Sequence, residues 1–188
     1  MEKITSIDLC KLSKEDLKGK IVVFPTDTVY GVGSLYLDEV GREKIYQMKK
    51  RDYGKPLPIL VGNINDAKKI ANITSDMDKY TSLWPGALTI VFKSINKMYP
   101  HDTIAIRIPN SKISIDILNH FGPMEVTSVN ISGEKELNDI KEIEEEFKDI
   151  IDYLVIDKAS FSKTPSTIIS LVNDFKVLRE GNIKFLKK

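Results

Sequence analysis

Apolar residues occur along this chain in short runs that are separated by polar stretches. Short apolar or β-branched runs bounded by turn residues are typical of buried strands. The 57–61 run contains Pro58, which lacks an N–H for pairing, so we expect that strand to begin late or to lie near an edge of the sheet. The sequence predicts strands at residues 21–23, 57–61, 88–92, 103–109, 125–128, 153–156, 167–172 and 175–178.

Helical periodicity fills most intervals between these strands. Asp38 is an expected N-cap for a helix that runs to about Lys50 and buries Val40, Ile45 and Met48. Strands interleaved with helices, with some strands adjacent, predict an α/β domain with a mixed sheet, and we expect residues 1–188 to form one domain. Further helices are expected at residues 11–20, 111–121 and 138–148, and after the caps Asn65 and Ser75.

The stretch from Phe24 to Gly33 is the strongest local candidate for a site. Pro25 should end the preceding strand, and two threonines, Asp27 and Tyr30 then follow within five residues. Glycines close the stretch and allow the backbone to approach a ligand. An ordinary turn, with Thr and Asp bonding their own backbone, would use the same residues, so local sequence leaves both readings open.

A second pattern places a charge in the middle of a strand. Residues 103–109 alternate, with Ile104, Ile106 and Ile108 on one face and Thr103, Ala105 and Arg107 on the other. Arg107 therefore lies opposite an apolar row.

Composition restricts the function classes. The chain has 41% hydrophobic and 29% charged residues and a net charge of +1, which gives no support for bulk nucleic-acid binding. Cys10 is the sole cysteine, so an internal disulfide is excluded and a reducing compartment fits. Because no apolar run is long enough to span a membrane or act as a signal peptide, we expect a cytoplasmic location.

Several cations and hydrogen-bond donors follow predicted strand or helix ends, where they could converge on one side of an open sheet. Together they suit a phosphate cradle, although each basic residue alone would also suit a solvated helix end. Glycine phosphate loops of known spacing are absent from the sequence, and His101 and His120 have no metal partners at ligand spacing. These observations leave alignment and electrostatics as the means of catalysis, and phosphoryl or nucleotidyl transfer can proceed in that way. The residues concerned are Lys49, Arg51, Lys55, Ser128, Asn130, Ser166 and Arg179.

The chain resembles the YrdC-like threonylcarbamoyl-AMP synthases. The matching blocks follow the family's order over about residues 20–182: Pro25–Gly31, Lys49–Arg51, Lys55–Leu57, Trp84–Thr89, Ala105–Pro109, Ser128–Asn130, Pro165–Ile168 and Leu178–Gly181. The resemblance implies a twisted open mixed sheet with helices on its faces, around a concave basic cleft. It also implies that L-threonine, bicarbonate and ATP, accompanied by Mg²⁺, form threonylcarbamoyladenylate and pyrophosphate. Separate partner proteins then complete the threonylcarbamoyladenosine modification of tRNA.

The resemblance also implies roles for individual residues. Metal ligands from the protein are not expected, and catalysis rests mainly on substrate alignment. Thr28, Tyr30, Arg107 and Ser166 are expected on the side of threonine and bicarbonate, with Arg107 holding the carboxylate. Lys49, Arg51, Lys55, Thr103, Ser128, Asn130 and Arg179 are expected on the side of ATP.

Two departures from the family pattern stand out. Leu60 takes the place of a histidine of longer relatives, which changes part of the expected threonine contact. The chain ends at Lys188, soon after the Arg179 block, as expected for a short single-domain form.

Two other functions remain open at this point. A YrdC-like protein could bind double-stranded RNA or tRNA in its cleft without making an adenylate; the near-neutral charge disfavours this. The carbamoyltransferases of hydrogenase maturation contain a similar domain, but with zinc-finger-like cysteines that a chain with Cys10 alone does not have.

Overall fold

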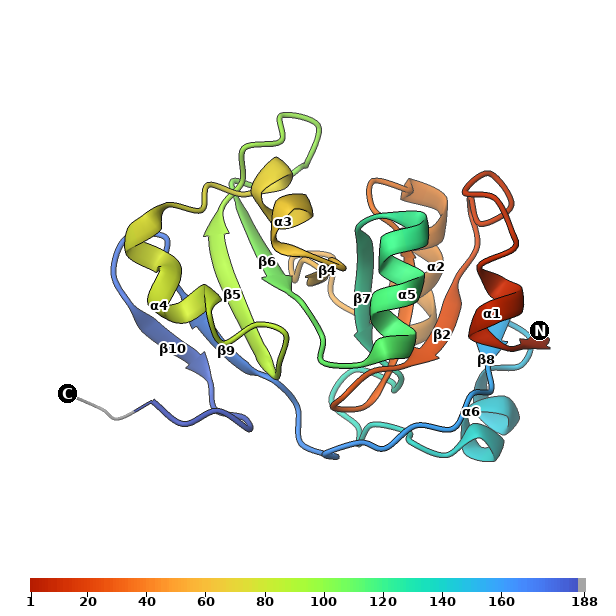
Figure 1. The fold of residues 1–188 in the computed structure, drawn as a ribbon. Helices are drawn as coiled ribbons and strands as arrows, with labels where there is room; N and C mark the ends of the chain where they lie inside the picture. Colours follow the sequence, from red (N-terminus) through yellow and green to blue (C-terminus); the bar gives the residue numbers. More distant parts are fainter. Residues whose placement is uncertain (186–188) are drawn as a thin grey trace.

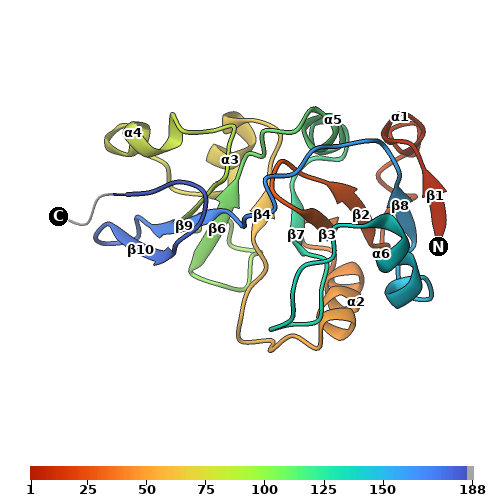
Figure 2. The same cartoon turned by 90° about the horizontal axis from the view of Figure 1, so that it is seen from below.

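The computed structural model describes residues 1–185, and its centre is a mixed sheet of ten strands (Figure 1). The strands lie in the order β1-β8-β2-β3-β7-β4-β6-β5-β9-β10. β1 and β10 form the two edges of this sheet (Figure 2). Their bounds are β1 Glu2–Ile4, β2 Val22–Pro25, β3 Tyr30–Leu35, β4 Ile59–Leu60, β5 Leu88–Lys93, β6 Thr103–Arg107, β7 Met124–Ser128, β8 Tyr153–Val155, β9 Thr167–Ser170 and β10 Lys176–Arg179.

Strand directions confirm the predicted mixed sheet. β2 and β3 form an antiparallel hairpin, and β3 continues antiparallel onto β7 and β7 onto β4. β4 pairs in parallel with β6, and β5 pairs in parallel with β9. Because such parallel pairs require crossover connections, residues far apart in the sequence meet on neighbouring strands at the sheet centre.

The helices begin at side-chain caps that the sequence largely predicts. The Asp38 side chain accepts from the Gly41 N–H at the start of α2, and Ser111 accepts from the Ser114 N–H at the start of α5. α2 and α5 lie on opposite sides of the sheet (Figure 2). The helices are α1 Ser6–Leu9, α2 Glu39–Lys49, α3 Ile64–Ile70, α4 Asp78–Thr81, α5 Lys112–Phe121 and α6 Ile140–Phe147, with a 3₁₀ turn at Ser75–Met77.

Side chains along the central strands point alternately to the two faces of the sheet, so that core residues lie on one face and Arg107 lies on the other. Ile104 and Ile106 of β6 pack in an apolar cluster with Ile59 and Ile90. Leu60 of β4 is paired with Arg107 on β6 and with Met124 on β7, so these three side chains lie on the other face of the sheet. The predicted orientation of Arg107 is confirmed. Its side chain is buried rather than solvated.

Four sequence predictions of helices and caps are wrong. Ser75 is not a cap but the first residue of the 3₁₀ turn, which Thr74 precedes without a side-chain cap hydrogen bond. Residues 11–20 form turns, because the segment has too few apolar positions for a buried stripe, and Gly19 adopts a φ of +69°. Val40 lies on the exposed side of α2, with 61% of its surface accessible, whereas Ile45 and Met48 are buried. The cap of α3 is Asn63 instead of Asn65, since Asn63 accepts from the Asp66 N–H.

The sheet also contains strands that the sequence did not predict. β1 was missed, and β4 begins late as expected but lies at the sheet centre rather than near an edge. β3 was missed because Gly31 and Gly33 are weak strand formers. Both glycines face Val126 on β7: a Cβ at Gly31 or Gly33 would come within 2.7 or 2.8 Å of a Val126 methyl group. Close packing of β3 against β7 therefore requires glycine.

This packing predicts how an alanine at Gly31 would behave. Gly31→Ala should lower the free energy of unfolding by about 1–3 kcal/mol, because the new methyl group overlaps Val126 in a filled core. In the double variant Gly31→Ala/Val126→Ala the loss should be smaller than the sum of the two single losses. Urea unfolding measures all three values. Gly54→Ala, at an exposed turn, is the control and should change stability by less than about 0.5 kcal/mol. If the losses from Gly31→Ala and Val126→Ala were strictly additive, the packing argument would be contradicted.

Candidate active site

A pocket opens on the sheet face that carries Leu60 and Arg107. Strands β3, β4, β5, β6, β7, β9 and β10 all contribute to it, together with the turn between β2 and β3. It is lined by Thr26, Thr28, Val29, Gly31, Pro58, Leu60, Thr89, Arg107, Val126, Thr127, Ser128, Glu136, Pro165, Ser166, Ile168 and Arg179.

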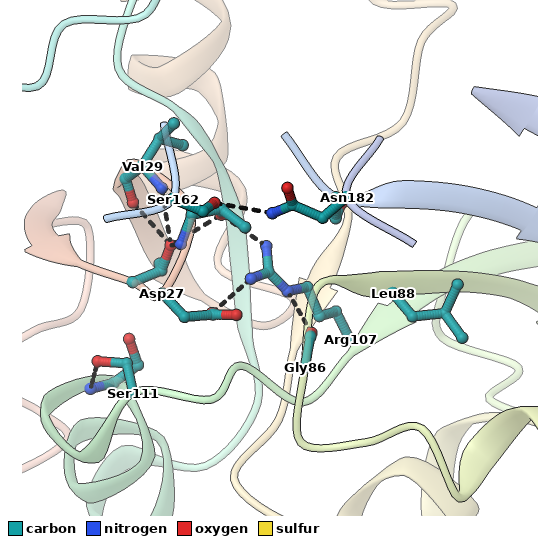
Figure 3. A network of polar contacts seen from close by, with 12 residues as sticks. Asp27, Val29, Gly86, Leu88, Arg107, Ser111, Ser162 and Asn182 are labelled. Atoms are coloured by element: carbon teal, nitrogen blue, oxygen red, sulfur yellow. Dashed lines mark hydrogen bonds and ion pairs between the residues drawn. The ribbon is translucent and has the colours of Figure 1, made fainter. Parts of the chain in front are cut away.

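Arg107 is the buried charge of this pocket (Figure 3). Its Nε donates to the carbonyl of Gly86 at 3.0 Å, and one terminal nitrogen donates to Thr28 Oγ1 at 2.9 Å. The other terminal nitrogen forms an ion pair with Asp27. Burial lowers the pKa of the Arg107 guanidinium, and the Asp27 carboxylate acts in the opposite direction. The group thus stays charged in a desolvated position.

The turn that carries Asp27 and Thr28 is held from two sides. Thr26 Oγ1 donates to the Val29 carbonyl at 2.7 Å, which closes the turn. The connection from β8 to β9 passes beside it, and the N–H groups of Ser162 and Lys163 donate to the carbonyls of Asp27 and Thr28 at 3.1 and 3.0 Å. These contacts give the turn a defined position relative to Arg107.

A second cation, Arg179, reaches the pocket from β10. Its Nε and a terminal nitrogen donate to the Ser166 carbonyl at 3.1 and 2.7 Å. The Ser166 hydroxyl lies 2.8 Å from Thr89 Oγ1 and 3.2 Å from the same guanidinium. Burial lowers the pKa of Arg179, while Glu136 favours its charged form. The sequence predicted Ser166 and Arg179 but missed Thr89 and Glu136.

Lys49 lies behind the pocket and is almost fully buried, with 2% of its surface exposed. Its ammonium group donates to the carbonyls of Ser128 and Asn130 at 2.6 and 2.9 Å and to Asn130 Oδ1 at 2.7 Å. The Ser128 hydroxyl donates to the same amide oxygen at 2.8 Å. Lys49 and Asn130 therefore hold the backbone at Ser128, and the predicted direct contact of Lys49 with phosphate would require these bonds to break.

The remaining predicted residues lie away from the pocket lining. Arg51 donates to the carbonyls of Lys55 and Pro56 at 3.0 and 3.2 Å, and the Lys55 side chain is exposed. Tyr30 is buried against the ring of Phe161, with 4.8 Å between ring centroids. Thr103, at the opposite end of β6 from Arg107, lines a separate surface hollow. The structure brings together Thr28, Arg107, Ser128, Ser166 and Arg179.

The lining is divided into a charged and an apolar part. Arg107, Arg179 and Glu136 are its charged members, and Leu60, Val126 and Ile168 supply apolar surface. Within residues 1–185, no cluster of three or more His, Cys, Asp or Glu side chains could hold a metal ion. No helix in that part of the chain is long and apolar enough to cross a membrane.

The burial of Lys49 predicts a specific pH dependence of stability. Desolvation, with a smaller contribution from Arg51, lowers the pKa of Lys49 to about 8, below its unfolded value of about 10.4. Between these two values the unfolded chain binds a proton that the native site has lost, so the free energy of unfolding should rise with pH. The rise attributable to Lys49 should be about 1–2 kcal/mol between about pH 7.5 and 9.5.

Urea unfolding of wild type and Lys49→Met at both pH values measures this contribution. Lys49→Met should lack the rise, whereas the control Lys112→Met, at a lysine whose side chain is 86% exposed, should retain it. The same pH slope in wild type and Lys49→Met would show that the ammonium is not perturbed by its burial.

Comparison with known proteins gives the same fold and a family. The family model named Sua5/YciO/YrdC, described as "Telomere recombination", matches residues 17–181. A Methanocaldococcus jannaschii protein, named provisionally as a threonylcarbamoyl-AMP synthase, is 38% identical over 182 residues, which cover 94% of this chain and 86% of the relative. A Pseudoalteromonas translucida protein named threonylcarbamoyl-AMP synthase is 30% identical over 86% of this chain and 91% of its own length.

Solved structures agree with the sequence matches. Pyrococcus abyssi Sua5 complexed with L-threonine has a TM-score of 0.83 and 28% identity. The match covers 96% of this chain and 56% of the Sua5 chain, so this protein corresponds to about half of that one. Escherichia coli YciO has a TM-score of 0.82 over 92% of this chain and 89% of its own, at 24% identity, which supports the fold. By its fold and its sequence, the chain belongs to the Sua5/YciO/YrdC family.

Proposed function

We propose that the protein is a threonylcarbamoyl-AMP synthase, which joins L-threonine, bicarbonate and ATP into threonylcarbamoyladenylate and releases pyrophosphate. The observation that carries the proposal is the buried Arg107 guanidinium, which faces a small pocket beside Thr28 in a chain whose relatives bear this name. A desolvated guanidinium in a pocket is a strong receptor for a carboxylate. The P. abyssi Sua5 structure with bound L-threonine supports an amino acid as the ligand of Arg107 in this chain.

Threonine would bind between the charged and apolar parts of the lining. Arg107 would hold its carboxylate, and the hydroxyls of Thr28 and Ser166 could meet its polar groups. Leu60, Val126 and Ile168 offer apolar contact for its methyl group. Tyr30 would act indirectly, because its side chain packs in the core against Phe161.

ATP would extend from this pocket toward Ser128 and Arg179. Lys49 and Asn130 would contribute by holding Ser128 in place, and Arg51 and Lys55 would contribute charge from the adjacent loop. A role for Thr103 would require the nucleotide to reach the far end of β6.

Mg²⁺ commonly binds through one or two carboxylates plus substrate phosphates, and Glu136, the carboxylate in the lining, fits that pattern. Bound there, Mg²⁺ would neutralise phosphate charge.

The chemistry needs alignment more than a protein nucleophile. The threonine amine first condenses with bicarbonate to give a carbamate, with loss of water. A carbamate oxygen then attacks the α-phosphorus of ATP, and the bond to the bridging oxygen breaks as pyrophosphate leaves. The carbamate is short-lived, so holding it beside the α-phosphate replaces a rare encounter and can lower the barrier by roughly 7–11 kcal/mol in ideal cases. Arg179 can stabilise the charge of the leaving group. The product would pass to partner proteins that modify tRNA.

Omission of substrates tests the proposed function. Pyrophosphate release from ATP should require both L-threonine and bicarbonate, and serine should support it about 10–200-fold less well in kcat/KM, because it lacks one methyl group. Release that does not depend on threonine would contradict the proposal. If the protein instead binds RNA without making an adenylate, RNA affinity should fall steeply as salt rises.

Arg107→Lys separates the two substrate sides. A lysine keeps the charge but loses the planar pair of donors, so the KM for L-threonine should rise by about tenfold or more while the KM for ATP changes little. The measurement is pyrophosphate release with each substrate titrated separately. Lys112→Met, at an exposed site on α5, is the control and should leave both constants unchanged. A raised KM for ATP with an unchanged KM for threonine would move Arg107 to the nucleotide side.

A further inference from the structure

Asp27 is a carboxylate at the site to which neither the sequence nor the relatives gave a role. It belongs to the turn between β2 and β3, and its side chain is 17% exposed. It forms an ion pair with Arg107 but does not line the pocket, whereas its neighbour Thr28 does. Figure 3 shows the Asp27 carboxylate beside the Arg107 guanidinium, and Asp27 makes this contact without lining the pocket.

The contacts of Arg107 show what this placement does. A guanidinium has five N–H groups, and three of them donate to Gly86, Thr28 and Asp27. One N–H on each terminal nitrogen has no partner among residues 1–185, and Arg107 lines the pocket. The Gly86 and Thr28 acceptors are neutral, so Asp27 supplies the charged contact that fixes how the terminal nitrogens are turned.

We propose that Asp27 is a positioning residue for threonine binding: it orients the Arg107 guanidinium so that its two free N–H groups face the substrate carboxylate. This inference rests on the proposed function. Hydrogen bonds to the backbone also hold in place the turn that carries Asp27. The backbone carbonyl of Asp27 accepts from the Ser162 N–H, and the Pro25 carbonyl two residues earlier accepts from Ser114 Oγ of α5 at 2.8 Å. The backbone that carries Asp27 is thus held by α5 and the β8–β9 connection.

An alternative role for Asp27 predicts the opposite result. If the carboxylate served only to balance charge, it would weaken the binding of a second carboxylate at Arg107. Its removal would then strengthen threonine binding. If it orients the guanidinium, its removal weakens threonine binding even though a negative charge has been taken away. The direction of the change in threonine affinity distinguishes the two roles.

Calorimetric titration with L-threonine and with ATP provides the test. Asp27→Ala should raise the Kd for threonine by about tenfold or more and leave the Kd for ATP within about twofold. Asp27→Asn should give a smaller rise, because a neutral amide oxygen still accepts from the guanidinium but holds it about half as strongly. If Asp27→Ala is too unstable to purify, the direction of the change in threonine Kd between wild type and Asp27→Asn still tests the proposal.

A double-variant comparison shows whether Asp27 acts through Arg107. In an Arg107→Lys background, adding Asp27→Ala should change the Kd for threonine by much less than it does alone. Asp152→Ala is the matched control: its side chain is 20% exposed and paired with Lys44, but it neither lines the pocket nor contacts Arg107, so threonine binding should not change. The free energy of unfolding, measured alongside, should fall in both Asp27→Ala and Asp152→Ala.

The outcomes separate this inference from the proposed function. Wild type that binds threonine, with an unchanged or lower Kd in Asp27→Ala and Asp27→Asn, overturns the positioning role and leaves the proposed function intact. Full additivity of Asp27→Ala and Arg107→Lys also overturns it. Wild type that does not bind threonine at all overturns both.

Discussion

A charged guanidinium buried at the centre of a sheet is the constraint on which the rest of the structure depends. Arg107 is removed from water, so it requires acceptors and a counter-charge from the protein. Gly86, Thr28 and Asp27 supply them from the segment before β5 and from the β2–β3 turn. That turn must therefore be held firmly, which explains its contacts with α5 and with the connection from β8 to β9.

The second half of the site depends on a similar arrangement in which a buried cation fixes the backbone. Lys49, at the end of α2, uses its ammonium group to hold the segment from Ser128 to Asn130. Close approach of β3 to β7 brings Ser128 beside the turn that carries Thr28, and Gly31 makes this approach possible. Two kinds of cation thus contribute differently: Arg107 and Arg179 face the pocket, and Lys49 supports its wall.

Much of this arrangement could be predicted from the sequence, because its signals are local. Asp38 and Ser111 mark helix starts within three residues, and the alternation around Arg107 gave its face correctly. The failures concern information that lies elsewhere in the chain. Gly31 was interpreted as a loop glycine because the residue that requires it, Val126, lies far along the chain. Lys49 was predicted to contact phosphate because its actual acceptors lie about 80 residues later. Asp27 and Glu136 were missed because their cations, Arg107 and Arg179, lie far from them in the sequence. Only the structure shows that Glu136 lines the pocket and that Asp27 does not.

The central claim is that Arg107 receives the carboxylate of threonine. The protein has four arginines, Arg42, Arg51, Arg107 and Arg179, so arginine labelled with ¹⁵N should give a simple Nε–H spectrum that can be assigned by substitution. The most direct measurement is to add L-threonine, and separately threoninol, which lacks the carboxylate. Our account predicts that L-threonine shifts the Arg107 signal at saturation and that threoninol does not. Equal shifts with both compounds, or an unchanged Arg107 signal with saturating threonine, would contradict it.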